Sequence, residues 1–142
     1  MTALQAVVLA LASLLPQEPP RIDEMPRRVC FDAPRAIFQV ENRAAVPVLA
    51  ALSVERWSDE GDTPAWVVVQ PDITQREGRP KEVRNLKLEA RQRRNVVWEL
   101  KKRVAPPSLA TGRHRLVVTY SFEASGSSST VTHEFVIADC GP

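Results

Sequence analysis

The 142-residue sequence predicts an all-β protein, an antiparallel β-sandwich of about seven or eight short strands. Apolar and polar residues alternate in one segment after another, which is the pattern of strands with one buried face. Turn residues such as Gly, Pro, Asn and Asp separate these segments at intervals of roughly 10–15 residues, a spacing typical of β-sandwiches. Residues 84–103 would tolerate a helix, but the β-prone Val96, Val97 and Trp98 favour a strand there.

Three strands are expected in the first half of the domain, each followed by a turn rich in Pro, Gly, Asn or Asp. The first is typical, because Ala36, Phe38 and Val40 share one face while Gln39 and Glu41 share the other. The expected strands are residues 36–42, 48–57 and 66–70.

Four more strands are expected in the second half. The last two are the clearest, because Leu116, Val118 and Tyr120 alternate on one strand, and Phe135 and Ile137 on the next. The Gly-Ser-Ser-Ser stretch between them supplies a turn, so the pattern predicts a hairpin. The expected strands are residues 83–88, 96–100, 115–122 and 131–137.

Residues 1–15 predict a signal peptide or a short apolar leader. The apolar run 6–15 is too short for a bilayer span, which needs roughly 20 residues, but it suits the apolar region of a secretory signal. Ala10 and Ala12 offer a small-x-small cleavage site. No Lys or Arg precedes the run, which leaves a buried or amphipathic first helix as the alternative.

The rest of the chain divides into a linker and a domain. Residues 16–27 are rich in proline and are expected to form an extended linker, because proline fixes φ and removes a donor. Residues 28–142 are expected to form the sandwich.

Cys30 and Cys140 lie near the two ends of this domain, and in an exported chain an even cysteine count indicates a disulfide. Two free thiols in a cytosolic protein are the alternative.

Several short motifs within residues 36–138 suggest a family resemblance. They are Phe38-x-Val40-x-Asn42, Pro47, Leu86-x-Leu88, Val96-x-Trp98 and the stretch 112–118. With these motifs, residues 36–138 resemble the immunoglobulin-like domains of exported bacterial proteins, and more loosely the domain named for an intracellular protease inhibitor. This resemblance implies a sandwich with a binding or structural role and assigns no functional residues. His114 stands where such domains often have a tyrosine that fixes the strand corner.

Catalytic and metal-binding patterns are missing from the sequence, so we expect neither an enzyme nor a cofactor. The five glycines are isolated, so no phosphate-binding loop is present, and no glycines frame a serine as in a nucleophile elbow. A hairpin turning at Gly126 would place His133 opposite residue 119 or 120, roughly 17–20 Å from His114. That separation would exclude a shared metal, and the parity of His133 with Phe135 predicts a core histidine.

Basic residues are concentrated in one segment, although the whole chain carries a net charge of only +2. Residues 73–103 hold 11 Lys or Arg and four Asp or Glu, whereas residues 1–72 hold six and ten. Segment 76–103 could bind an anionic lipid, a glycan or another polyanion, or it could be a solvated edge that deters strand association. Nucleic acid is not expected, because Trp98 has the parity of a core residue and no other aromatic lies in the segment for base stacking. The candidate basic residues are Arg91, Arg93, Arg94, Lys101, Lys102 and Arg103.

Trp57 and Trp66 flank an acidic turn, and the parity of Trp57 points it away from the apolar face of its strand. An exposed tryptophan beside a loop is a candidate anchor for a partner, because tryptophan is enriched in binding hot spots. Either residue could instead cover the core or the second sheet.

We therefore expect an exported, periplasmic or extracellular, non-enzymatic domain that binds a protein or forms part of an envelope assembly. The alternative is a binder of an anionic envelope polymer through segment 76–103. A membrane would be contacted only through an uncleaved leader.

Overall fold

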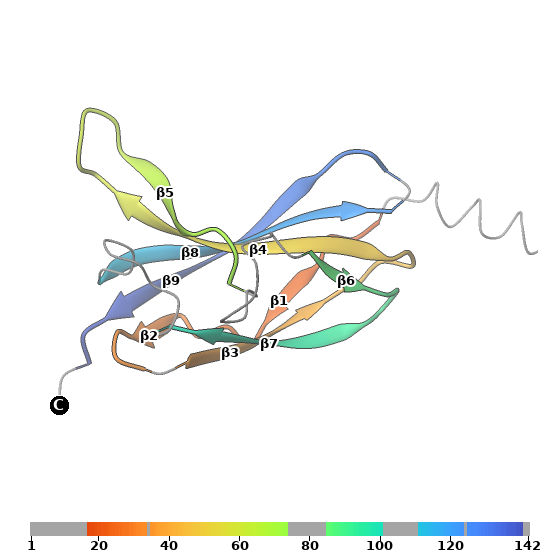
Figure 1. Ribbon diagram of the computed structural model, residues 1–142, viewed down its shortest axis with the longest axis horizontal. Coiled ribbons are helices and arrows are strands. Elements are labelled where there is room, and N and C mark those ends of the chain that lie inside the picture. The colour runs from red at the N-terminus through yellow and green to blue at the C-terminus, as the bar shows by residue number, and fades with distance from the viewer. Residues whose placement is uncertain (1–16, 34, 74–84, 101–110, 124, 141–142) are drawn as a thin grey trace, which may run out of the picture.

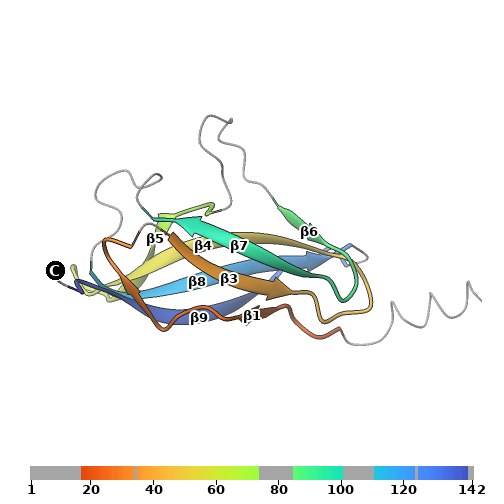
Figure 2. The same ribbon diagram turned by 90° about the horizontal axis from the view of Figure 1, so that it is seen from below.

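The computed structural model describes residues 17–33, 35–73, 85–100, 111–123 and 125–140. They form two stacked β-sheets (Figures 1 and 2). The smaller sheet has the order β1 (Arg21–Asp23), β3 (Arg35–Glu41), β7 (Arg93–Glu99). The larger sheet has the order β2 (Arg28–Cys30), β9 (Ser129–Ala138), β8 (Gly112–Phe122), β4 (Val48–Ser58), β5 (Ala65–Gln70), and β6 (Leu86–Leu88) also pairs with β4. Among these residues no helix is long and apolar enough to cross a membrane.

This arrangement is an immunoglobulin-like sandwich, as the sequence predicted. The three-stranded sheet corresponds to strands A, B and E of that fold, and β9, β8, β4 and β5 correspond to G, F, C and C′. Among the described strands all pairings are antiparallel except that of β2 with β9, which is parallel. The parallel pair was not predicted, because alternation indicates which face of a strand is buried but not which strands are neighbours.

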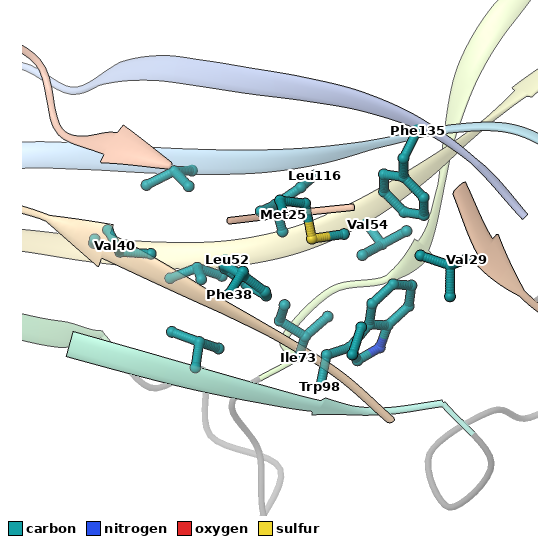
Figure 3. Packing of buried hydrophobic residues seen from close by; sticks show 14 of the residues in the cluster. Met25, Val29, Phe38, Val40, Leu52, Val54, Ile73, Trp98, Leu116 and Phe135 are labelled. Atoms are coloured by element: carbon teal, nitrogen blue, oxygen red, sulfur yellow. The ribbon is translucent and has the colours of Figure 1, made fainter. Parts of the chain in front are cut away.

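The core lies between the sheets and is built from the alternating residues of both (Figure 3). Trp98 is fully buried and packs edge-to-face on Phe135, with 5.7 Å between ring centroids. Its indole N–H donates to the Oε1 atom of Gln70, at the end of β5, so one hydrogen bond joins the two sheets. A buried indole without a partner would cost free energy, and this bond avoids that cost.

The stretch expected to be a linker is instead part of the sandwich. β1 pairs with β3, and Met25 is only 6% exposed and packs in the core (Figure 3). Glu24 has a positive φ of 61°, where the chain leaves the smaller sheet to join the larger one as β2. Strands of three residues are too short to show a period of two, which is why the sequence did not reveal them. The expected leader, residues 1–15, lies outside the described residues.

The expected disulfide is present. Cys30 at the end of β2 is bonded to Cys140, just after β9, and their Cα atoms are 5.5 Å apart. The bridge therefore lies beside the parallel β2–β9 pair and closes a loop across a sequence separation of 110 residues. In the chain-entropy model such a loop contributes about 4–5 kcal/mol of stability.

The β3–β4 turn is organised by the buried Asn42. Its Nδ2 donates to the carbonyl oxygens of Val46, Leu88 and Glu89, and its Oδ1 accepts from the N–H of Ala44. These bonds tie the β3–β4 turn to the turn between β6 and β7. The asparagine noted in the sequence motif is thus a structural residue.

The register of the last hairpin differs from the prediction. His133 lies opposite Leu116, and His114 lies opposite Phe135, so the histidines occupy diagonal positions rather than sites 17–20 Å apart. The reason is that the chain turns earlier than Gly126: the N–H of Ser125 donates to the carbonyl of Phe122 at 3.0 Å. A shift of the turn by a few residues moves every cross-strand pair.

Candidate interaction face on the larger sheet

Trp57 and Trp66 form a cross-strand pair on the outer face of the larger sheet. The register of the β4–β5 hairpin places them directly opposite each other. Their rings pack edge-to-face with centroids 5.3 Å apart, and both side chains are half-buried. The inward positions of β4, such as Leu52 and Val54, belong to the core, so the tryptophans are not needed to fill it.

Two arginines from the neighbouring strand β8 cover these rings. The guanidinium carbon of Arg113 lies 5.2 Å from the centroid of Trp57 and 5.1 Å from that of Trp66. The guanidinium carbon of Arg115 lies 4.4 Å from the centroid of Trp66. At these distances the cations are attracted to the negative faces of the rings. This arrangement follows from the alternation of side chains along β8. His114 is buried and points to the inner face, so its two neighbours, Arg113 and Arg115, point to the outer face.

Each arginine is held in place by a carboxylate on an adjacent strand. Arg113 donates to Glu134 of β9 at 2.7 Å, and the Nε of Arg115 donates to Glu55 of β4 at 2.6 Å. The Arg115–Glu55 pair is the less exposed, with side chains 27% and 17% accessible. The two rings and two guanidinium groups therefore come from three strands, β4, β5 and β8, and the guanidinium groups are held by ion pairs to Glu55 and Glu134. We call Trp57, Trp66, Arg113 and Arg115 the Trp–Arg cluster.

Exposed apolar side chains flank the Trp–Arg cluster on the same outer face. Val68 on β5 is 53% exposed, and it lies opposite Glu55. Val136 on β9 is 45% exposed, and it lies opposite Arg113. The face thus combines tryptophan and arginine, which are enriched in protein-binding hot spots, with exposed aliphatic surface beside them.

The structure separates the described members of the basic segment. Arg91 is exposed in the β6–β7 turn with a φ of 63°, and Arg93 on β7 is bound to Glu41 at 2.8 Å. This carboxylate raises the pKa of Arg93. Arg94 is half-buried and has the parity of the core residue Val96, so it points to the opposite side of the sheet from Arg93. Lys101, Lys102 and Arg103 lie outside the described residues.

The two histidines point inward and have no metal-binding neighbours in the described part of the chain. His114 is fully buried, its Nδ1 lies 2.9 Å from the carbonyl oxygen of Gly112, and its ring stacks on Phe135. Burial lowers its pKa, the Gly112 carbonyl opposes this, and Arg56 lowers it further. His133 is half-buried on the same face, in keeping with its predicted inward parity. Within the described residues no three His, Cys, Asp or Glu side chains are gathered closely enough to hold a metal ion.

Sequence reasoning singled out the two tryptophans but missed the arginines that cover them. Arg113 and Arg115 alternate with inward residues of β8, which marks them as outward-facing. Their proximity to Trp57 and Trp66 depends on β8 pairing with β4, and that neighbour relation cannot be read from one sequence.

Comparison with known proteins supports the fold and does not identify a family. No family model and no curated protein sequence matches the chain. It is similar to a chain in the crystal structure of the CsuC–CsuE chaperone–tip adhesion subunit pre-assembly complex from archaic Csu pili of Acinetobacter baumannii. The TM-score is 0.56 at 14% identity, over 87% of this chain and 58% of that one. At this identity the likeness concerns the fold alone.

Two weaker similarities are to parts of larger enzymes. One is the alkylpurine DNA glycosylase AlkC of Pseudomonas fluorescens, with a TM-score of 0.44 and 15% identity over 94% of this chain and 34% of that chain. The other is a β-glucosidase of Listeria innocua, with a TM-score of 0.46 and 13% identity over 85% of this chain and 16% of that chain. In each of these three comparisons the chain spans less than two thirds of the protein that it resembles.

Proposed function

We propose that the chain is an exported, non-enzymatic domain that binds another protein through the Trp–Arg cluster on the outer face of its larger sheet. The observation that carries this proposal is the placement of two tryptophans outside the core, where ion-paired arginines hold them. A solvated sheet face does not require tryptophan, whereas tryptophan and arginine are the residues that most often dominate protein interfaces.

The preorganised geometry of the cluster favours binding. Arg113 and Arg115 are each fixed by a carboxylate and by a ring, so ordering them on association costs little side-chain entropy. The exposed Val68 and Val136 extend the apolar area to either side. A partner with an apolar centre and a polar rim that carries carboxylates would match this surface.

Export is supported by the disulfide and by the kind of protein that shares the fold. Disulfides persist in oxidising compartments and are rare in the cytosol. The chain with the similar fold belongs to a complex of a chaperone with a tip adhesion subunit, which is compatible with a role in protein contacts. If the proposal is right, an alkylating reagent will modify Cys30 and Cys140 of protein from native cells only after reduction.

The alternative, polyanion binding through segment 76–103, receives less support from the described residues. Arg93 is neutralised by Glu41, and Arg94 points to the other side of the sheet. Strong polyanion binding uses several cations that reach one surface together.

The test is site-specific photo-cross-linking in cells of the native host. A photoreactive amino acid replaces either Val136, on the Trp–Arg face, or Val97, which is 44% exposed on the smaller sheet. We expect position 136 to give a discrete adduct with another envelope protein, identified by mass spectrometry, and position 97 to give none. Trp57→Ala in the same chain should abolish the adduct, because it removes the centre of the cluster.

Two results would overturn the proposal. One is an adduct that forms equally from both positions. The other is an adduct at position 136 that survives both Trp57→Ala and Arg113→Ala while the variants remain folded. Trp57 lies on β4 rather than on the edge strand β5, so its replacement leaves the outer edge of the sheet intact.

A further inference from the structure

In the described part of the chain, β5 forms an outer edge of the larger sheet. β5 is the last strand of the larger sheet and pairs only with β4 among the described residues. Figure 1 shows the β4–β5 hairpin projecting away from the other labelled strands. Val67 and Val68 point to opposite faces of the hairpin, and they are 44% and 53% exposed. Both faces of β5 are therefore partly exposed at these positions. An edge strand with free backbone N–H and C=O groups is a template for another strand.

β5 lacks most features that usually protect an edge. Its sequence, Ala-Trp-Val-Val-Val-Gln, contains no charged residue and no proline. The pairing with β4 skips Val69, so the one bulge lies near the Gln70 end and leaves Ala65–Val68 in regular register. Natural edge strands are normally guarded by lysines, prolines, bulges or a covering segment. An uncharged apolar edge is therefore suited to an uncharged apolar strand.

The side-chain pattern of β5 is complementary to itself. Trp66 and Val68 point to the outer face, and Val67 points to the other. An antiparallel pair of two β5 strands about a twofold axis at Val67 places Trp66 of each copy opposite Val68 of the other. Aromatic residues opposite β-branched ones are among the favourable cross-strand pairs. The same orientation keeps the acidic turns of the two copies, which hold Asp59, Glu60 and Asp62, at opposite ends of the pair.

We infer that the partner of this edge is a second copy of the chain, and that the protein forms a twofold dimer by antiparallel pairing of β5 with β5. The interface is isologous, because each copy contributes the same strand. It joins the two larger sheets into one continuous sheet, and the Trp–Arg clusters of the two copies become neighbours on one face. This inference does not depend on the proposed protein partner.

Sedimentation equilibrium of the full chain at micromolar to submillimolar concentration tests the dimer. We expect the wild type to approach twice the 15.8 kDa chain mass. Val67→Lys places two lysines opposite each other at the axis, so we expect it to remain a monomer. The matched control is Val97→Lys, since Val97 is also 44% exposed but lies on the smaller sheet. It should dimerise like the wild type. Association driven by residues 1–15 would instead persist in Val67→Lys, which carries the same residues.

Thiol cross-linking tests the register without relying on a lysine variant. In the proposed dimer residue 67 faces its own copy, with Cβ atoms about 5 Å apart. Val67→Cys should therefore be joined into a covalent dimer by a short bis-thiol reagent under conditions that leave the Cys30–Cys140 bond intact. Ala65→Cys should not, because the two copies of residue 65 would lie about 13 Å apart. A monomeric wild type, a dimer that Val67→Lys leaves intact, or equal cross-linking at positions 65 and 67 would overturn the inference.

Discussion

The two edges of the larger sheet are built in opposite ways. At one edge β9 is partly covered by β2, and the disulfide fixes that contact covalently. At the other edge β5 has no strand beyond it in the described part of the chain, and no charge of its own. The first edge is closed by the N-terminal end of the domain, whereas the second is left available. We infer that stability is concentrated at the first edge and association at the second.

The largest effect is expected at the closed edge. Replacing Cys30 and Cys140 by serine should lower the free energy of unfolding by about 4–5 kcal/mol, because the unfolded chain loses the cross-link. Guanidinium unfolding measures the change, and reduction of the wild type should reproduce it. Any folded fraction of the double variant should still dimerise through β5. A loss below about 1 kcal/mol would mean that β2 is held mainly by its pairing with β9.

A smaller effect is expected where the open edge is tied to the core. Gln70→Ala should cost about 1–3 kcal/mol, because it leaves the buried indole N–H of Trp98 without a partner. Urea unfolding measures the loss. Gln39→Ala is the matched control, since Gln39 is a half-buried glutamine on the smaller sheet whose Oε1 has no hydrogen-bond partner. Equal losses from the two variants would show that the Trp98 bond contributes nothing specific.

The smallest effect is expected at the stretch of β9 that β2 does not cover. Glu134→Gln removes the 2.7 Å ion pair with Arg113, whose side chains are about half exposed. Exposed pairs of this kind contribute about 0.2–1 kcal/mol, so thermal unfolding should change little. The chain mass in sedimentation should match that of the wild type. If Val67→Lys combined with Glu134→Gln were dimeric, β9 would be a second association edge and the contrast between the edges would fail.

The alternation of apolar residues predicted most of the fold. Phe38 and Val40, or Leu116 and Val118, mark strands with one buried face, and that is a local property of each segment. The Cys30–Cys140 bridge was also predictable, because the chain offers only one possible pairing. The same reasoning identified Trp57 as outward-facing, since a period of two distinguishes the two faces of a strand.

What sequence reasoning missed were relations between segments. β1 and Met25 were assigned to a linker, because three residues beside prolines carry no periodic signal. The hairpin register was wrong because a turn of polar residues allows several loop lengths, and each gives different cross-strand pairs. The Trp–Arg cluster required the β4–β8 pairing. In each case the missing information was which strands are neighbours, and by how many residues they are offset.

The position of the disulfide also determines how the domain would respond to a pulling force. Cys30 and Cys140 lie side by side at the two ends of a covalent loop that contains most of the sandwich. Tension applied through the two chain ends would pass across the sulfur–sulfur bond and bypass β3 to β9. Only β1 and β2, which precede the bridge, could be peeled from their neighbours. Under load the domain would lengthen by the few residues of its N-terminal segment, while the Trp–Arg cluster and the β5 edge kept their shape.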